Sequence, residues 1–186
     1  MSQKLLIVGA GTYAVVAAEI AADMGIFEKI DFIDDGKTQT PNGIPVAGTT
    51  QQLSAFSQSY DSIVVAIGNP EVRLSLLSQI EEQTSFRITS LISPKAYIAP
   101  SAHIESGCII EPMAVVHSGC VLARGCIVSA GAVINHASKC SEGVHVDCNA
   151  TVAGYCIVPA GTKIGSGTVY KSEETVNPEE VFLRKK

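Results

Sequence analysis

The sequence has little positive charge: 13 Lys and Arg stand against 18 Asp and Glu among 186 residues, for a formal net charge of −5. A general nucleic-acid-binding protein needs a basic face that neutralises phosphates, so this balance argues against that class. No apolar run reaches the roughly 20 residues that a membrane-spanning helix needs. The first residues, MSQKLLIVGAG, reach glycine too early for a secretion signal. We therefore expect a cytoplasmic protein without a membrane span.

What the sequence does contain is a strict six-residue repeat of apolar side chains between residues 92 and 164. An α-helix repeats about every 3.6 residues and a half-buried strand every two, so neither explains a period of six. Three hexapeptides make one triangular coil of about eighteen residues, and coils stack at about 4.8 Å, the spacing of paired strands. The repeated residues are Ile92, Ile98, Ile104, Ile110, Val116, Leu122, Val128, Ile134, Cys140, Val146, Val152, Val158 and Ile164. The repeat predicts a parallel β-helix of about four coils.

Four residues after each apolar position comes a small or slim side chain, as expected near a coil corner where a large one would not fit. Glycine often precedes that position, and we expect a positive φ there because the corner is tight. These glycines are Gly107, Gly119, Gly125, Gly131, Gly143, Gly161 and Gly167.

The same repeat accounts for the six cysteines. Four occupy the small-residue position, Cys140 occupies the apolar position, and only Cys148 falls outside both. The four are Cys108, Cys120, Cys126 and Cys156. The chain lacks a CxxC pair and any spacing typical of metal ligands. We therefore expect unpaired, mostly buried thiols, which suit a reducing cytoplasm, and no metal site.

The first ninety or so residues have a different pattern, in which apolar strands alternate with helical stretches. Strands are expected at 4–8, 29–34 and 62–68, and helices at 15–25 and 70–82. Asn69 is placed to cap the second helix, with Pro70 at its first position. This alternation predicts a small Rossmann-like parallel sheet, and hence two domains, 1–90 and 91–186.

The loop between the first strand and helix has the form Gly-x-Gly-x-x-Ala, beginning at Gly9. Backbone N–H groups in such a loop can hold a phosphate at the helix N-terminus, and Asp34 at the end of the next strand is expected to contact a ribose or base. A nucleotide smaller than NAD is favoured, because the segment holds only about half of the usual dinucleotide fold. The predicted substrate-binding residues are Gly9, Gly11, Thr12, Tyr13, Asp34, Asp35, Gly68 and Asn69. The alternative is a tight strand–helix turn without a ligand.

An α/β nucleotide half followed by a hexapeptide β-helix resembles the bacterial sugar acyltransferases that include UDP-amino-sugar N-acetyltransferases of the bacillosamine pathway and sialic acid O-acetyltransferases. The resemblance covers nearly the whole chain and rests on IVGAGTYAVVAAEIA, FIDDG, GIPVAGTTQQL, VVAIGN and VINHASKCSEGVHVDCNATVAG. It implies a left-handed β-helix and a homotrimer with active sites between subunits. It also implies a nucleotide sugar (UDP- or dTDP-linked) on the N-terminal domain and acetyl-CoA as co-substrate between adjacent β-helices, with no metal.

The resemblance also assigns roles to residues. It implies that Asn135 and His136 are the catalytic residues, with His136 as general base. It places His145 at the acetyl-CoA end of the site, and the backbone around Ala153 and Gly154 against the thioester carbonyl. Histidine suits this role because it titrates near neutral pH and can take the proton that a sugar ammonium loses on attack.

The chain departs from the family in three places: Ala137 stands where Asp or Glu usually follows the histidine, Thr12-Tyr13 replaces Gly-His, and the tail lacks Gly-x-Pro-Ala. We expect the tail to form a strand or two over the open end. The predicted function is acetyl-CoA-dependent N-acetylation of a nucleotide-linked amino sugar in cell-surface glycan biosynthesis.

Three alternatives remain. One is O-acetylation of sialic acid or another sugar. A second, motivated by Ala137, is binding of CoA or nucleotide without turnover. A third, a zinc carbonic anhydrase on the same β-helix, is disfavoured because no two histidines lie a multiple of eighteen residues apart. The four histidines are His103, His117, His136 and His145.

Overall fold

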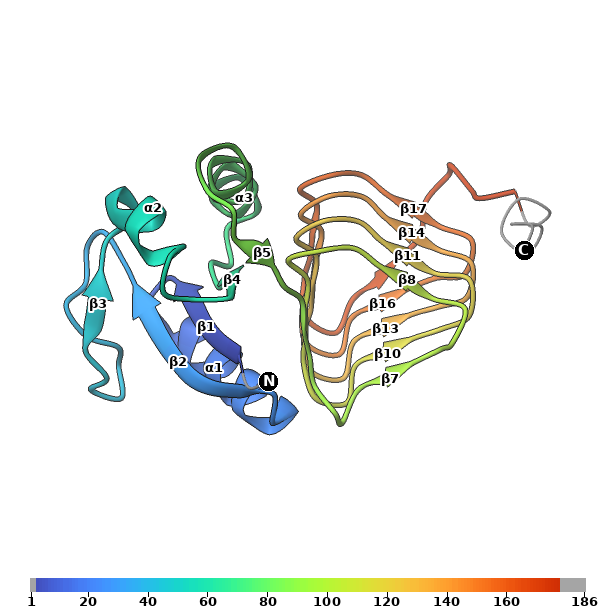
Figure 1. The fold of residues 1–186 in the computed structure, drawn as a ribbon. Coiled ribbons are helices and arrows are strands. Elements are labelled where there is room, and N and C mark those ends of the chain that lie inside the picture. The colour runs from blue at the N-terminus through green and yellow to red at the C-terminus, as the bar shows by residue number, and fades with distance from the viewer. Residues whose placement is uncertain (1–2, 178–186) are drawn as a thin grey trace.

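A five-stranded parallel sheet with the strand order β3-β2-β1-β4-β5 opens the fold (Figure 1). The computed structural model describes residues 3–177. The strands of this sheet are β1 (Gln3–Val8), β2 (Phe27–Ile33), β3 (Val46–Gly48), β4 (Ser62–Val65) and β5 (Arg87–Ile88). The helices are α1 (Thr12–Met24), the 3-10 turn η1 (Thr50–Gln52), α2 (Leu53–Phe56) and α3 (Pro70–Gln83). The expected parallel α/β arrangement is confirmed.

Local sequence signals set the ends of the two long helices. α1 stops at Gly25, which adopts a left-handed φ of 67° and donates its N–H to the Ala22 carbonyl at 3.1 Å. α3 begins where the Asn69 side chain accepts the Val72 N–H at 3.1 Å, with Pro70 at the first position, as predicted. The strand expected to reach residue 68 ends at Val65, because the carbonyls of Ile67 and Gly68 accept hydrogen bonds from Arg73 instead of from a neighbouring strand.

The rest of the described chain is a left-handed parallel β-helix of two-residue strands. Its three sheets have the orders β19-β16-β13-β10-β7, β17-β14-β11-β8 and β18-β15-β12-β9-β6. The strands are β6 (Leu91–Ile92), β7 (Tyr97–Ile98), β8 (His103–Ile104), β9 (Ile109–Ile110), β10 (Val115–Val116), β11 (Val121–Leu122), β12 (Ile127–Val128), β13 (Val133–Ile134), β14 (Lys139–Cys140), β15 (His145–Val146), β16 (Thr151–Val152), β17 (Ile157–Val158), β18 (Lys163–Ile164) and β19 (Val169–Tyr170). Val115 pairs with Val133 and Val133 with Thr151, so the expected stack at eighteen residues is confirmed.

The prism interior is made of the repeated apolar and small residues, as predicted. Ile110, Val116 and Leu122 are all 0% exposed, and the five in-register cysteines are buried and unpaired, whereas Cys148 is exposed. The seven corner glycines have φ between 67° and 73°. The same corner position holds four residues that are not glycine and still have positive φ: Met113, Ala137, Asn149 and Tyr155.

One side of the prism packs against the α/β unit (Figure 1). This side is the β18-β15-β12-β9-β6 sheet, from which Leu91, Ile109 and Ile127 enter an apolar cluster with α1 residues such as Ala14 and Ala17. At the other end of the chain, β19 adds to the stack and the tail turns back, so that the Val176 N–H donates to the Tyr155 carbonyl at 2.8 Å. Of the tail strands expected over the open end, the described part shows β19 and one isolated antiparallel bridge between Cys156 and Thr175, and residues 178–186 lie outside it.

None of the helices within residues 3–177 is both long enough and apolar enough to cross a membrane.

Candidate functional site

His136 lies on an exposed corner of the β-helix, between β13 and β14. Its ring Nδ1 is 2.8 Å from Oδ1 of Asn135. The same Oδ1 accepts the backbone N–H of His136, also at 2.8 Å. The Oδ1 of one expected catalytic residue, Asn135, therefore bonds both the backbone and the ring of the other, His136. The imidazole is fixed through Nδ1.

The next coil holds the imidazole from above. The Tyr155 N–H donates to the His136 carbonyl at 3.0 Å, which stacks the two corners. A Cβ added to Gly154 would lie 3.0 Å from both Cε1 and Nε2 of His136, so the imidazole rests against a bare Cα. The Tyr155 ring is nearly perpendicular to the imidazole, with centroids 4.9 Å apart and an interplanar angle of 88°. The prediction that Gly154 lies one coil above His136 is confirmed.

The two predicted backbone donors differ in their bonding. The Ala153 N–H already donates to the Tyr170 carbonyl at 3.0 Å, and the Ala153 carbonyl accepts the Ser138 hydroxyl at 2.7 Å. Ala153 therefore cannot be the oxyanion donor that was expected, because the stacking of β19 uses its N–H. Gly154 is the candidate donor at this corner.

Ala137 follows His136 with a φ of 59° and is 0% exposed. Its N–H donates to the Ser118 carbonyl of the coil before at 2.9 Å. The position where the family usually carries a carboxylate is therefore a buried methyl group in a left-handed corner, and it supplies no charge to the imidazole.

His145 lies elsewhere, on β15 of the sheet that faces the α/β unit. It is 6% exposed, its Nε2 is 3.3 Å from the Ser129 Oγ, and its ring centroid is 6.4 Å from that of Tyr13 on α1. Burial lowers the pKa of His145, and the positive charges of Lys163 and Arg73 lower it further. Within one chain the structure does not bring His145 to His136.

Tyr13 on α1 and His145 on β15 are neighbours across the boundary between the two domains. Among the described residues, neither the Tyr13 hydroxyl nor the His145 Nδ1 has a hydrogen-bond partner, although both atoms are buried. Burial raises the pKa of Tyr13 well above its usual value, and the Glu111 carboxylate nearby raises it further. Tyr13 thus faces the β-helix and does not line the cavity described next.

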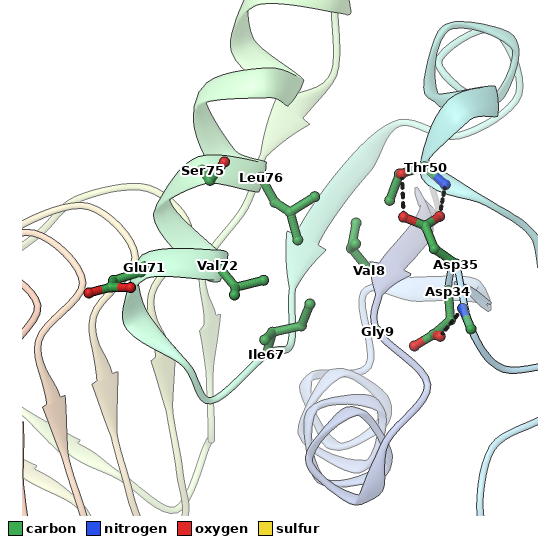
Figure 2. Close-up of a pocket in the computed structure, with 11 residues that line it drawn as sticks. Val8, Gly9, Asp34, Asp35, Thr50, Ile67, Glu71, Val72, Ser75 and Leu76 are labelled. Carbon is green, nitrogen blue, oxygen red and sulfur yellow. Dashed lines mark hydrogen bonds between the residues drawn. The ribbon is translucent and has the colours of Figure 1, made fainter.

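A cavity of ≈ 550 Å³ opens at the carboxyl ends of β1 and β4 (Figure 2). The chain runs from β1 to β2 on one side and places β4 on the other, and ligands bind at this kind of reversal in open α/β sheets. Figure 2 shows the acidic Asp34 and Asp35 facing apolar side chains of α3 across the opening. The lining residues are Val8, Gly9, Asp34, Asp35, Gly36, Thr50, Ile67, Glu71, Val72, Ser75 and Leu76.

The two aspartates shape this cavity through backbone hydrogen bonds. Asp34 accepts the Ala10 N–H at 2.8 Å and the Gly36 and Lys37 N–H groups at 2.9 Å, which joins the glycine loop to the end of β2. Asp35 accepts the N–H of Thr50 at 2.8 Å and its hydroxyl at 2.7 Å. Each Asp35 oxygen keeps one lone pair that can receive a ligand donor.

Of the eight predicted substrate-binding residues, Gly9, Asp34 and Asp35 line the cavity. The other five do not: Gly11, Thr12 and Tyr13 start α1, and Gly68 and Asn69 lead into α3. Sequence reasoning missed Thr50, Val72 and Leu76. The Thr49–Gln52 capping box is a sequence signal that would have placed Thr50 at the start of a turn, and Val72 and Leu76 lie four apart on one helix face.

Residues 3–177 contain no group of three or more His, Cys, Asp or Glu side chains that could hold a metal ion.

Two protein families match this chain. The PglD N-terminal domain family matches residues 4–80, and the bacterial transferase hexapeptide family (six repeats) matches residues 101–136. None of the curated proteins matches it significantly.

Similar solved structures extend over most of the chain. The acetyltransferase domain of PglB from Neisseria gonorrhoeae FA1090, in complex with acetyl coenzyme A, is 34% identical with a TM-score of 0.86, and the match covers 91% of this chain and 82% of that one. A mutant of perosamine N-acetyltransferase from Caulobacter crescentus, in complex with CoA and GDP-perosamine, is 23% identical with a TM-score of 0.69, covering 90% of this chain and 88% of that one. The second likeness shows the fold alone.

Proposed function

This chain belongs to the bacterial sugar acyltransferases that join a PglD-type N-terminal domain to a hexapeptide β-helix, and from that premise we propose that it transfers acetyl from acetyl-CoA to the amine of a nucleotide-linked sugar. The resemblance predicted from the sequence is thereby confirmed. Residues 1–90 would bind the nucleotide sugar and residues 91–186 would carry the acetyl transfer, in the cytoplasm.

The observation that carries the proposal is the packing of the His136 imidazole against the bare Cα of Gly154. As the sugar nitrogen attacks the thioester carbonyl, the C–N bond forms and the amine proton passes to Nε2 of His136 and then to solvent. The Gly154 N–H would donate to the oxyanion that develops on the carbonyl. The C–S bond then breaks and CoA leaves as a thiolate that takes up a proton. The acetyl-CoA-bound relative at 34% identity supports this choice of acetyl donor.

The nucleotide would lie in the cavity between the glycine loop and α3. Val72 and Leu76 offer an apolar wall to a base, and the free lone pairs of Asp35 can accept an N–H or O–H of the nucleotide. The sugar would then point out of the cavity.

The active site would lie between subunits of a homotrimer. β13 and β14 belong to the two sheets that do not face the α/β unit (Figure 1). His136 lies between these two strands, so it sits on the edge of the prism away from that unit. A sugar held by one chain therefore needs the His136 corner of a second copy.

A mostly apolar stripe next to that corner, exposed at its ends, supports the same assembly. Outward side chains of the β19-β16-β13-β10-β7 sheet stack in register, and Tyr97 and Val169 at its ends are 55% and 62% exposed. The stripe consists of Tyr97, Val115, Val133, Thr151 and Val169. Solenoids often cover such flat faces by oligomerisation.

The test is a screen of UDP-, dTDP- and GDP-linked amino sugars with acetyl-CoA, following free thiol. Wild type should turn over at least one acceptor, and His136→Ala should lose about 10²–10⁴-fold. His103→Ala is the matched control, because it removes another exposed histidine of the same β-helix, on β8. Undiminished activity of His136→Ala would remove His136 as the base, and turnover of hydroxyl acceptors only would assign O-acetylation instead.

A further inference from the structure

We infer that Asn135 is a positioning residue whose side-chain oxygen holds neutral His136 as the Nδ1–H tautomer and leaves Nε2, beside Gly154, free to accept a proton. The inference rests on the proposed function for its catalytic meaning. The tautomer itself follows from the hydrogen bonds alone.

The first step concerns the identity of the Asn135 atom. The His136 backbone N–H lies 2.8 Å from it, and a backbone N–H is always a donor. The atom must therefore be the amide oxygen and not the amide nitrogen, because two donors would face each other in the opposite orientation.

The second step concerns the imidazole. An amide oxygen carries no proton, so the 2.8 Å contact to His136 Nδ1 is a hydrogen bond only when Nδ1 is the donor. A neutral imidazole has one proton, so Nε2 then has the free lone pair. Nε2 is also the nitrogen that lies against the Cα of Gly154, next to the candidate oxyanion donor.

The third step concerns the missing carboxylate. In enzymes that pair a histidine with a carboxylate, the carboxylate fixes the tautomer and also stabilises the imidazolium. Asn135 fixes the tautomer but carries no charge. Ala137 supplies no carboxylate, and Tyr155 contributes an aromatic ring perpendicular to the imidazole.

The surroundings contain few charges that would substitute. By strand register, the titratable groups around this corner are His117 and Tyr155 on the neighbouring coils, Lys171 and Glu173 two coils beyond, and Lys139 on β14. The structure therefore assigns a base that is oriented by a neutral group.

The test combines a spectroscopic readout with kinetics. Two-bond ¹H–¹⁵N correlation spectra of the ¹⁵N-labelled protein, with His136 identified by its loss in His136→Gln, should show the Nδ1–H tautomer at alkaline pH. Asn135→Ala should shift the ring toward the Nε2–H tautomer and lower kcat by roughly tenfold or more while the KM for the nucleotide sugar stays unchanged. A wild-type spectrum of the Nε2–H form would overturn the inference.

The conservative variant separates orientation from charge. Asn135→Asp keeps the acceptor and adds a carboxylate, so activity should survive while the acid limb of the kcat/KM profile moves up by about one pH unit. An Asn135→Asp profile identical to that of wild type, or a loss of activity equal to that of Asn135→Ala, would contradict the inference. Because the spectra need no substrate, failure of the acetyl-transfer proposal leaves the tautomer result standing, and the reverse also holds.

Discussion

Arg73 on α3 donates a hydrogen bond from Nη2 to the carbonyl of Gly143 on the β-helix, at 2.7 Å. Its Nε donates to the Gly125 carbonyl of the coil before, also at 2.7 Å, while Nη1 reaches Ile67 and Gly68 in its own domain. The side chain is 0% exposed, and burial lowers its pKa. Its acceptors are thus backbone carbonyls from both domains, and two of them follow β4 beside the cavity.

Replacing this cation should loosen the two domains. Arg73→Met would leave four carbonyls without a charged donor, those of Gly125 and Gly143 in buried hydrogen bonds, and we expect the free energy of unfolding to fall by about 3 kcal/mol. The urea unfolding transitions measured by fluorescence and by circular dichroism should no longer coincide, because the two domains uncouple. Lys37→Met, which removes an exposed cation of the α/β unit, is the control and should change stability by about 0.5 kcal/mol or less. Equal effects of the two variants would contradict this reading of Arg73.

The corner glycines allow packing and backbone strain to be separated. Gly143 and Gly161 both have a φ of 68°, but a Cβ on Gly143 would lie 2.8 Å from Leu74 Cδ1, whereas one on Gly161 meets nothing within 4 Å. Gly161→Ala should cost about 1–2 kcal/mol from the left-handed backbone alone. Gly143→Ala should cost a further 1–3 kcal/mol, roughly, from overpacking at the domain interface. Thermal or urea unfolding measures both, and equal losses would show that Leu74 moves aside freely.

Gly154 should be sensitive for a different reason. Its φ is not positive, so Gly154→Ala should fold normally, but the new methyl group would displace the His136 ring by contact with Cε1 and Nε2. We expect kcat to fall by roughly tenfold or more with the KM for the nucleotide sugar little changed. Gly165→Ala is the matched control, because its Cβ would meet only Thr168 Cγ2 at 3.9 Å. Similar kinetics in both variants would show that catalysis does not depend on the position of the His136 imidazole.

Stability should depend on the protonation of His145. Its pKa in the folded chain is lowered, mainly by burial, so the unfolded chain binds more protons between that value and the usual one of about 6.5. The stability is therefore fully present above about pH 6.5 and is lost as the pH falls below it. His145→Gln should flatten this slope in urea midpoints measured from pH 7.5 downward. Exposed His103→Gln should leave the slope as it is, and a wild-type slope in His145→Gln would rule out His145 as its source.

Mixed oligomers test the shared active site. His136→Ala and Val72→Trp, the latter filling the nucleotide cavity from a side chain that is 45% exposed, should each be inactive alone. Co-assembled in equal amounts, they should recover roughly a quarter of wild-type activity, because each site takes its histidine and its cavity from different chains. No recovery in verified mixed oligomers would place both halves of the site in one chain.

The β-helix was predictable because its six-residue period is strict and each side chain then has a fixed place. The period put Cys140 in the core and Gly154 one coil above His136, and both are found there. It did not reveal that Tyr155 adopts a left-handed corner, because glycine is the only residue whose sequence signal marks that conformation.

The α/β unit was predictable in its long elements and less so in its cavity. The cavity depends on which helix face meets the sheet edge. The spacing of Val72 and Leu76 puts them on one face of α3 but does not say what that face meets. The place of His145 under Tyr13 likewise arises from the docking of two domains, which a repeat pattern in one of them does not encode. The role of His136 as base stays a prediction.

The buried thiols of the prism give the folded chain an internal reporter. Only Cys148 is exposed among the six cysteines, so a thiol reagent added to the native protein should titrate one equivalent per chain, a fixed background in any assay of released CoA. The other five become reactive only as coils open. Since each coil contacts only its neighbours, labelling of Cys156 ahead of Cys108 would show the prism unwinding from its last coil, one cysteine at a time.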